Sequence, residues 1–215
     1  MKGQDIVVLV KLVSLHQRLA GIEMQRAKDL TSPAYAWQGW HAPESKDKPL
    51  EEESEHGNLL GDEFSVRGLE ASLGISKSEV NASIKRSYQC GLAIQDRKTG
   101  HPKANVTGLI EFIAHGLKYV FPAQPGAMVR GIPTAAAAPV LQGELISLEE
   151  YIHVWPDPQG LKMGQAIKPL FKSVPHAVRR DAELYATLAL IDAIRLGQPR
   201  EARLARELLE KRLKA

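Results

Sequence analysis

The chain has 215 residues, of which 44% are hydrophobic and 25% are charged, and its formal net charge is +3. These values match globular averages and exclude a disordered, collagen-like or coiled-coil chain. The single cysteine, Cys90, excludes a disulfide scaffold and a thiolate zinc site. We expect it to be a small buried residue, and a redox-sensing thiol is the alternative interpretation. No apolar run reaches the length of a membrane span, so we expect a cytoplasmic protein without membrane contact.

The charge is distributed unevenly along the sequence. Residues 1–63 carry a net charge of −4, residues 64–108 carry +4, and residues 109–215 carry +3. Positive charge per residue is therefore highest in the short middle segment, where a surface for a polyanion would be sought. A solvated basic face remains the alternative interpretation of this segment.

An amphipathic helix is predicted near the start of the chain. Apolar residues recur in residues 6–13 at the spacing of one helix face, which indicates a core-facing helix that ends near Leu19. In residues 20–62 this periodicity fails, proline recurs, and an acidic run follows. We interpret residues 20–62 as an acidic loop or insertion.

The next segment predicts two helices joined by a short turn. Ser65 can cap a first helix, and Gly74 can take a positive φ at its end. Ser76 and Glu79 have the spacing of a capping box, which would open a second helix. Because the first helix is short, the pair must pack against a third helix, and residues 6–13 are the candidate.

A β-hairpin and a further helix follow. Residues 92–95 and 104–106 are compatible with strands, and the polar residues between them predict a turn with a basic tip. Residues 109–120 then form a broad apolar helix face, which Asn105 or Thr107 could cap.

The rest of the sequence divides into two parts. Residues 121–180 are rich in Pro and Gly, so most of them should form neither a long helix nor a central strand, although their apolar residues indicate packing on the body. Residues 182–196 and the chain from Pro199 onward predict two helices that form a hairpin, docked on the body or on a second subunit.

These elements predict a mainly α fold with a small β-hairpin wing. A winged helix-turn-helix domain would comprise residues 1–19 and 63–120, interrupted by the acidic insertion at 20–62. Residues 121–215 would form a Pro/Gly-rich packed region that ends in the helical hairpin and serves dimerisation or docking.

A second helix of this kind binds DNA by entering the major groove with short polar and basic side chains. Asparagine can pair with adenine, and lysine can reach guanine or phosphate. Residues of the wing and helix N-termini can hold phosphates. The candidate DNA-binding residues are Ser65, Arg67, Ser76, Lys77, Ser78, Asn81, Lys85, Arg86, Arg97, Lys98 and Lys103.

The run from Phe64 to Val80, followed by Gly91, Leu92 and the wing, resembles the winged helix-turn-helix of bacterial MarR-type regulators. More narrowly, stretches within residues 109–134 and 154–158 resemble a poorly characterised group of such proteins, often encoded beside nucleotidyltransferase-like toxin genes. The resemblance implies a transcriptional regulator, with repression of a toxin or defence operon as the expected activity. We expect a homodimer, because one recognition helix covers only a few base pairs. Where such motifs usually have alanine, this sequence has Glu70.

Other functions have less support in the sequence. The seven histidines lack metal-ligand spacing and no phosphate-binding glycine loop is present, so we expect no enzyme, no cofactor and no metal site. The competing hypothesis is a protein-interaction module without DNA. It would act as an antitoxin or adaptor for a neighbouring protein through the acidic, tryptophan-containing insertion and the terminal helices.

Overall fold

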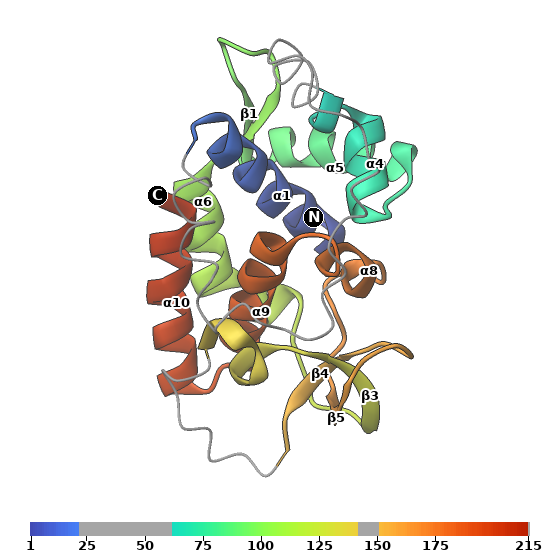
Figure 1. Ribbon diagram of the computed structural model, residues 1–215. Helices are drawn as coiled ribbons and strands as arrows, with labels where there is room; N and C mark the ends of the chain where they lie inside the picture. The colour runs from blue at the N-terminus through green and yellow to red at the C-terminus, as the bar shows by residue number, and fades with distance from the viewer. Residues whose placement is uncertain (22–61, 142–150, 215) are drawn as a thin grey trace.

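The computed structural model describes residues 1–21, 62–141 and 151–214, so residues 22–61 of the predicted insertion lie outside the described residues (Figure 1). Helices predominate, and two small sheets accompany them. Within the described ranges, no helix has the length and apolar character that crossing a membrane requires.

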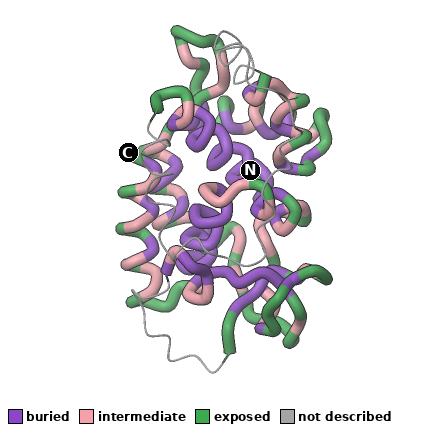
Figure 2. The backbone as a smooth tube through the Cα atoms, in the orientation of Figure 1, coloured by how far each residue is buried: buried purple, intermediate pink, exposed green. Residues whose placement is uncertain are grey.

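Helix α1, Gly3–Leu19, lies at the centre of the molecule (Figures 1 and 2). The predicted apolar stripe is only part of its buried surface, because Val7, Val8 and Leu12 on other sides of the helix are buried as well. Its one buried lysine, Lys11, forms an ion pair of 2.8 Å with Asp181. Helix α1 therefore packs against elements from both halves of the chain rather than covering one of them.

Helices α4, Val66–Leu73, and α5, Lys77–Gln89, are joined by a turn of three residues, as the sequence predicted. The Ser65 hydroxyl accepts a hydrogen bond of 3.0 Å from the Gly68 amide, which confirms the predicted cap. Gly74 ends α4 with φ 63°, a conformation that favours glycine. Both helices pack against α1, which supplies the third helix that the sequence required.

A two-stranded antiparallel hairpin follows α5. Strands β1, Ala93–Gln95, and β2, Pro102–Ala104, pair with Ala93 opposite Ala104, and both alanines are buried. The chain continues through α6, Val106–Glu111, a π-helical turn, Phe112–Gly116, and α7, Leu117–Val120. Asn105 caps α6, as predicted, whereas Val120 was wrongly assigned to the apolar face and is exposed.

A second sheet occupies the Pro/Gly-rich region and corrects the prediction of a mainly α fold. Strands β3, Met128–Pro133, β4, His153–Pro156, and β5, Lys162–Ala166, each pair with the other two. A Cβ on Gly131 would lie 2.1 Å from the Trp155 carbonyl oxygen, so the close strand approach requires glycine there. Strand β3 pairs with two strands that lie beyond residue 150, a pairing that a local pattern does not reveal.

The remaining helices close the structure. They are the 3₁₀ turns Ala135–Ala137 and Pro139–Leu141, and the helices α8, Val174–Val178, α9, Ala182–Leu196, and α10, Pro199–Lys214. Helices α9 and α10 form the predicted hairpin, which turns at Gly197 with φ 77°. Helix α10 packs on α9 and α6, along the edge of the molecule opposite α8 (Figure 1). The hairpin is thus docked on the body of its own chain.

Candidate nucleic-acid interface

Helix α5 has one buried face and one exposed face. Val80, Ser83 and Ser87 are buried, and the helix packs on that side against α1 and α4. In the first two-thirds of the helix the exposed positions are polar or basic: Lys77, Ser78, Asn81 and Lys85. Tyr88 and Gln89 are exposed at its C-terminal end. Since a helix turns by 3.6 residues, this spacing keeps the four side chains on one broad surface.

The N-terminus of α5 is capped differently from the prediction. Ser76 makes no side-chain cap hydrogen bond, and Glu79 instead accepts hydrogen bonds from Gln4 and Lys2 near the start of α1. The predicted capping box is therefore wrong. A carboxylate from the preceding helix replaces it, because Glu70 Oε1 accepts a hydrogen bond of 3.3 Å from the Lys77 amide.

Lys77 is also the ion-pair partner of Glu70, with 3.6 Å between Nζ and Oε2, and both side chains are more than a third exposed. An exposed pair of this kind contributes less than about 1 kcal/mol, so a phosphate could replace the carboxylate. The Ser76 and Ser78 hydroxyls lie 3.3 Å apart beside it. The end of α5 thus presents short polar groups and a lysine.

Arg86 is placed differently from the other candidates. Its Nε and Nη2 donate hydrogen bonds of 3.0 and 2.7 Å to the two carboxylate oxygens of Asp5, which is fully buried. Burial of Asp5 would raise the pKa of that carboxyl, but the hydrogen bonds from Arg86 and the Lys2 amide bring it below its usual value. Arg86 therefore fastens α5 to α1.

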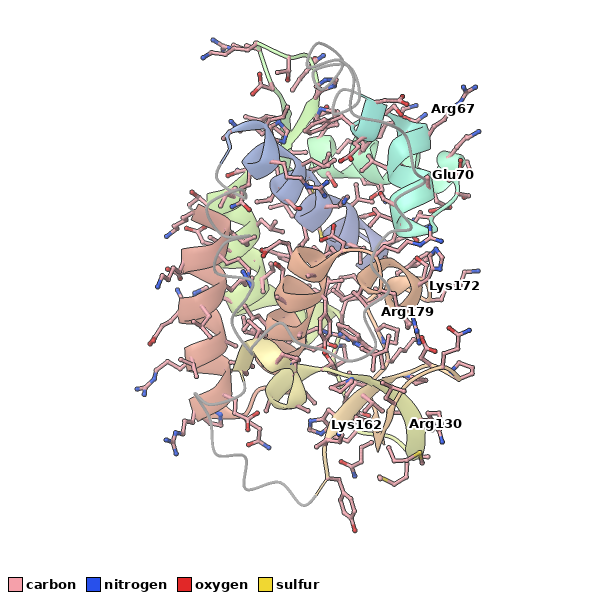
Figure 3. The ribbon with its side chains drawn as sticks, viewed as in Figure 1. Arg67, Glu70, Arg130, Lys162, Lys172 and Arg179 are labelled. Atoms are coloured by element: carbon pink, nitrogen blue, oxygen red, sulfur yellow. The ribbon has the colours of Figure 1, made fainter. Side chains whose placement is uncertain are left out.

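Two candidates flank the N-terminus of α4. The Ser65 hydroxyl is already engaged as the helix cap. Arg67 is exposed and extends away from the body of the molecule (Figure 3). Of these two, Arg67 is therefore the side chain that is not engaged in the cap.

The hairpin carries the remaining candidates, and it rises beside the α1–α5 layer (Figure 1). Arg97 and Lys98 are exposed in its turn. Asp96 organises that turn by accepting hydrogen bonds from the amides of Lys98 and Thr99, which lower the pKa of its carboxyl. Lys103 on β2 pairs with the same carboxylate at 3.7 Å.

An aromatic stack connects the hairpin to the body. The rings of Phe64 and His101 are stacked, with their centroids 4.7 Å apart. The His16 ring of α1 contacts Phe64 edge-on, with 4.8 Å between the two centroids. The hairpin is therefore held to the body at His101, next to its turn, as well as through the chain.

The candidates thus fall into separate groups. One surface of α5 holds Lys77, Ser78, Asn81 and Lys85 together, and the hairpin holds Arg97, Lys98 and Lys103. Ser65 serves as a cap and Arg86 as a structural anchor. The capping role of Glu70 was missed, because the Lys77 amide lies seven residues later, beyond the reach of a local capping pattern.

Two further expectations concern chemistry. Cys90 is exposed at the end of α5, so the expectation that it is buried is wrong. In the part of the chain that the structure describes, no three His, Cys, Asp or Glu side chains form a group that could hold a metal ion.

The comparisons with known proteins return no relative. No family model matches the sequence, and no curated protein or solved structure matches the chain.

Proposed function

We propose that the protein is a sequence-specific, double-stranded DNA-binding transcriptional regulator of winged-helix type. The observation that carries this proposal is the division of α5 into a buried face and an exposed face with Lys77, Ser78, Asn81 and Lys85. A helix that is anchored on one side and polar on the other is what insertion into the major groove requires. The basic hairpin beside it fits the role of a wing.

In this proposal, some side chains read the base sequence and others contact the phosphates of any duplex. Asn81 would read adenine through its amide, and Lys85 would reach guanine or a phosphate. Arg97, Lys98 and Lys103 would hold phosphates, and the two phosphates nearest the helix starts would meet Arg67 and Lys77. Asn81 therefore contributes sequence preference, whereas the hairpin contributes affinity for any duplex.

Two further parts of the proposal concern the assembly state and the outcome of binding, and the second rests on the resemblance to MarR-type regulators. One recognition helix covers only a few base pairs, so two copies on a palindromic site are needed for a useful preference, and we propose a homodimer. The expected outcome of binding is repression, with a toxin or defence operon as the candidate target.

The test is a mobility shift of the protein on DNA from upstream of its own gene, at about 50 and about 200 mM salt. Asn81→Ala should cost about 1 to 3 kcal/mol on the preferred site and relax the preference at one base pair. Its matched control is Gln89→Ala, an exposed amide at the far end of α5. Equal affinity of wild type and Asn81→Ala for every sequence would contradict base reading by α5.

Lys98→Ala tests the wing separately. Removal of one phosphate contact should weaken binding to all sequences alike and reduce the slope of log affinity against log salt by about 0.9. Lys211→Ala, an exposed lysine of α10, is the control and should leave the slope unchanged. Both variants behaving as wild type would remove the hairpin from the interface.

A protein-interaction module is the second candidate function. The observation that favours it lies on the three-stranded sheet, where Met128, Leu161 and Met163 are each about half exposed. Exposed apolar side chains of this size are typical of protein contacts. Stable co-purification with a protein encoded nearby, without salt-dependent retention on DNA, would favour this function over the first.

A further inference from the structure

A stretch of the chain that carries only positive charges lies outside the predicted winged helix. Residues 158–180 contain five Lys and Arg and no Asp or Glu, whereas residues 181–214 mix seven basic with six acidic residues. The run includes β5, α8 and the connections on either side of α8. Its exposed cations are Lys162, Lys168, Lys172 and Arg180.

This run is packed directly against the turn that precedes α5. The Ser173 hydroxyl donates a hydrogen bond of 2.6 Å to the Leu73 carbonyl oxygen at the end of α4. A Cβ on Gly74 would lie 3.3 Å from Ser173 and 3.4 Å from His176, so α8 touches the turn itself. A Cβ on Gly3 would lie 2.1 Å from the Leu170 carbonyl oxygen, so this part of the run also packs against the start of α1. Residues 170–176 are therefore fixed against both α1 and α4.

Figure 3 shows the consequence along one edge of the molecule. Arg67 and Glu70 of α4 lie above Lys172, and Arg179 and Arg130 follow below it. Asp157 pairs with Arg179 at 2.9 Å, Asp181 pairs with Lys11, and Glu70 pairs with Lys77 at 3.6 Å. The exposed cations of residues 158–180 thus retain their charge for an external partner.

We infer that the residues on either side of α8, chiefly Lys172 before it and Arg180 after it, form a second phosphate-binding surface. This surface extends the DNA contact beyond the winged helix. This inference rests on the proposed function. The N-terminal half of a recognition helix lies deepest in the major groove, and phosphates line both sides of that groove. Lys172 directly precedes Ser173, which contacts the turn before α5, and Arg180 follows the other end of the short helix α8. Cations on this segment would meet one of those phosphate rows.

A salt titration of DNA binding tests this inference separately from the proposed function. Lys172→Gln/Arg180→Gln removes two charges and should reduce the slope of log affinity against log salt by about 2, with weaker binding to all sequences and an unchanged base preference. A nuclease footprint should shorten at one end of the protected site. Both side chains are exposed, and thermal unfolding should therefore match wild type.

The matched control is Arg203→Gln/Lys211→Gln, which removes two exposed charges from α10 on the opposite edge. It should leave the slope and the footprint unchanged. Equal losses from the two double variants would indicate net charge alone and would overturn the inference. Normal binding by Lys172→Gln/Arg180→Gln, together with weakened binding by Lys98→Ala, would overturn it and leave the proposed function standing. Wild-type protein that does not bind DNA would overturn both.

Discussion

Each half of the molecule contains a buried aspartate–arginine pair, and the two pairs differ in their access to water. In the C-terminal half, Asp192 and Arg195 are 2.5 Å apart, and both side chains are almost wholly buried. In the N-terminal half, Asp5 is fully buried, but a quarter of the Arg86 side chain is exposed. The first pair lies entirely within the core, whereas the second reaches from the core to the edge of the candidate DNA surface.

The surroundings of the two pairs explain this difference. Asp192 also accepts hydrogen bonds from Trp155, at 2.5 Å, and from Thr134, at 3.0 Å, so it joins α9 to the three-stranded sheet. Asp5 joins α1 to α5. The C-terminal pair therefore secures the scaffold, and the N-terminal pair fixes the orientation of the helix that carries the candidate residues.

Asp192→Asn should have the largest effect on stability. Loss of the charge leaves Arg195 buried without a counter-ion, which costs about 3 to 5 kcal/mol. Urea unfolding monitored by circular dichroism measures this loss. The double variant Asp192→Leu/Arg195→Met removes both charges and should recover part of it; a single variant that costs less than about 1 kcal/mol would contradict a buried, charged pair.

Asp5→Asn should cost less, about 2 to 3 kcal/mol near neutral pH, because solvent reaches Arg86 and compensates for the lost partner. The folded-state pKa of Asp5 lies below its unfolded value of about 3.9, so the pair stabilises fully above that value and less as pH falls through the folded pKa. The stability difference between wild type and Asp5→Asn should therefore shrink at acidic pH. A difference that stays constant on acidification would disprove the ionised pair.

Substitutions of two neighbouring cations on α5, Arg86 and Lys85, should affect stability and DNA binding separately. Arg86→Gln should destabilise by about 2 kcal/mol, since it leaves Asp5 buried and unpaired, and should leave the salt slope of binding unchanged. Lys85→Gln should reduce that slope by about 0.9 without affecting stability. The reverse pattern in unfolding and mobility-shift measurements would mean that Arg86 is the phosphate contact.

Arg206→Ala should have the smallest effect. Arg206 and Glu210 form an exposed pair of 3.1 Å one helical turn apart on α10. Such pairs contribute about 0.3 to 0.5 kcal/mol. We expect the thermal unfolding temperature to lie within error of wild type. A loss of stability as large as that of Asp5→Asn would contradict the difference in strength between buried and exposed pairs.

Local patterns in the sequence predicted the elements around α5 well. Caps and turns depend on residues three or four apart, so Ser65, Gly74 and Asn105 could be assigned before any contact was known. The exposed positions of α5 followed from helical periodicity in the same way.

The remaining features depend on contacts between distant residues. Arg86 was predicted as a groove residue because its partner, Asp5, lies 81 positions earlier in the sequence. Glu79 was assigned to a capping box for the same reason, since Gln4 and Lys2 compete for its carboxylate. The three-stranded sheet was missed because Pro and Gly mark its strand ends and close approaches, and those residues also mark loops.

The most direct measurement is backbone hydrogen–deuterium exchange of the protein with and without a duplex from upstream of its own gene. Residues 77–86 and the hairpin turn around Lys98 should exchange more slowly when the duplex is present. Residues 199–214 of α10, on the opposite edge, should be unaffected. Protection confined to α10 or to the three-stranded sheet, or no protection under conditions where the duplex is bound, would contradict DNA recognition by α5.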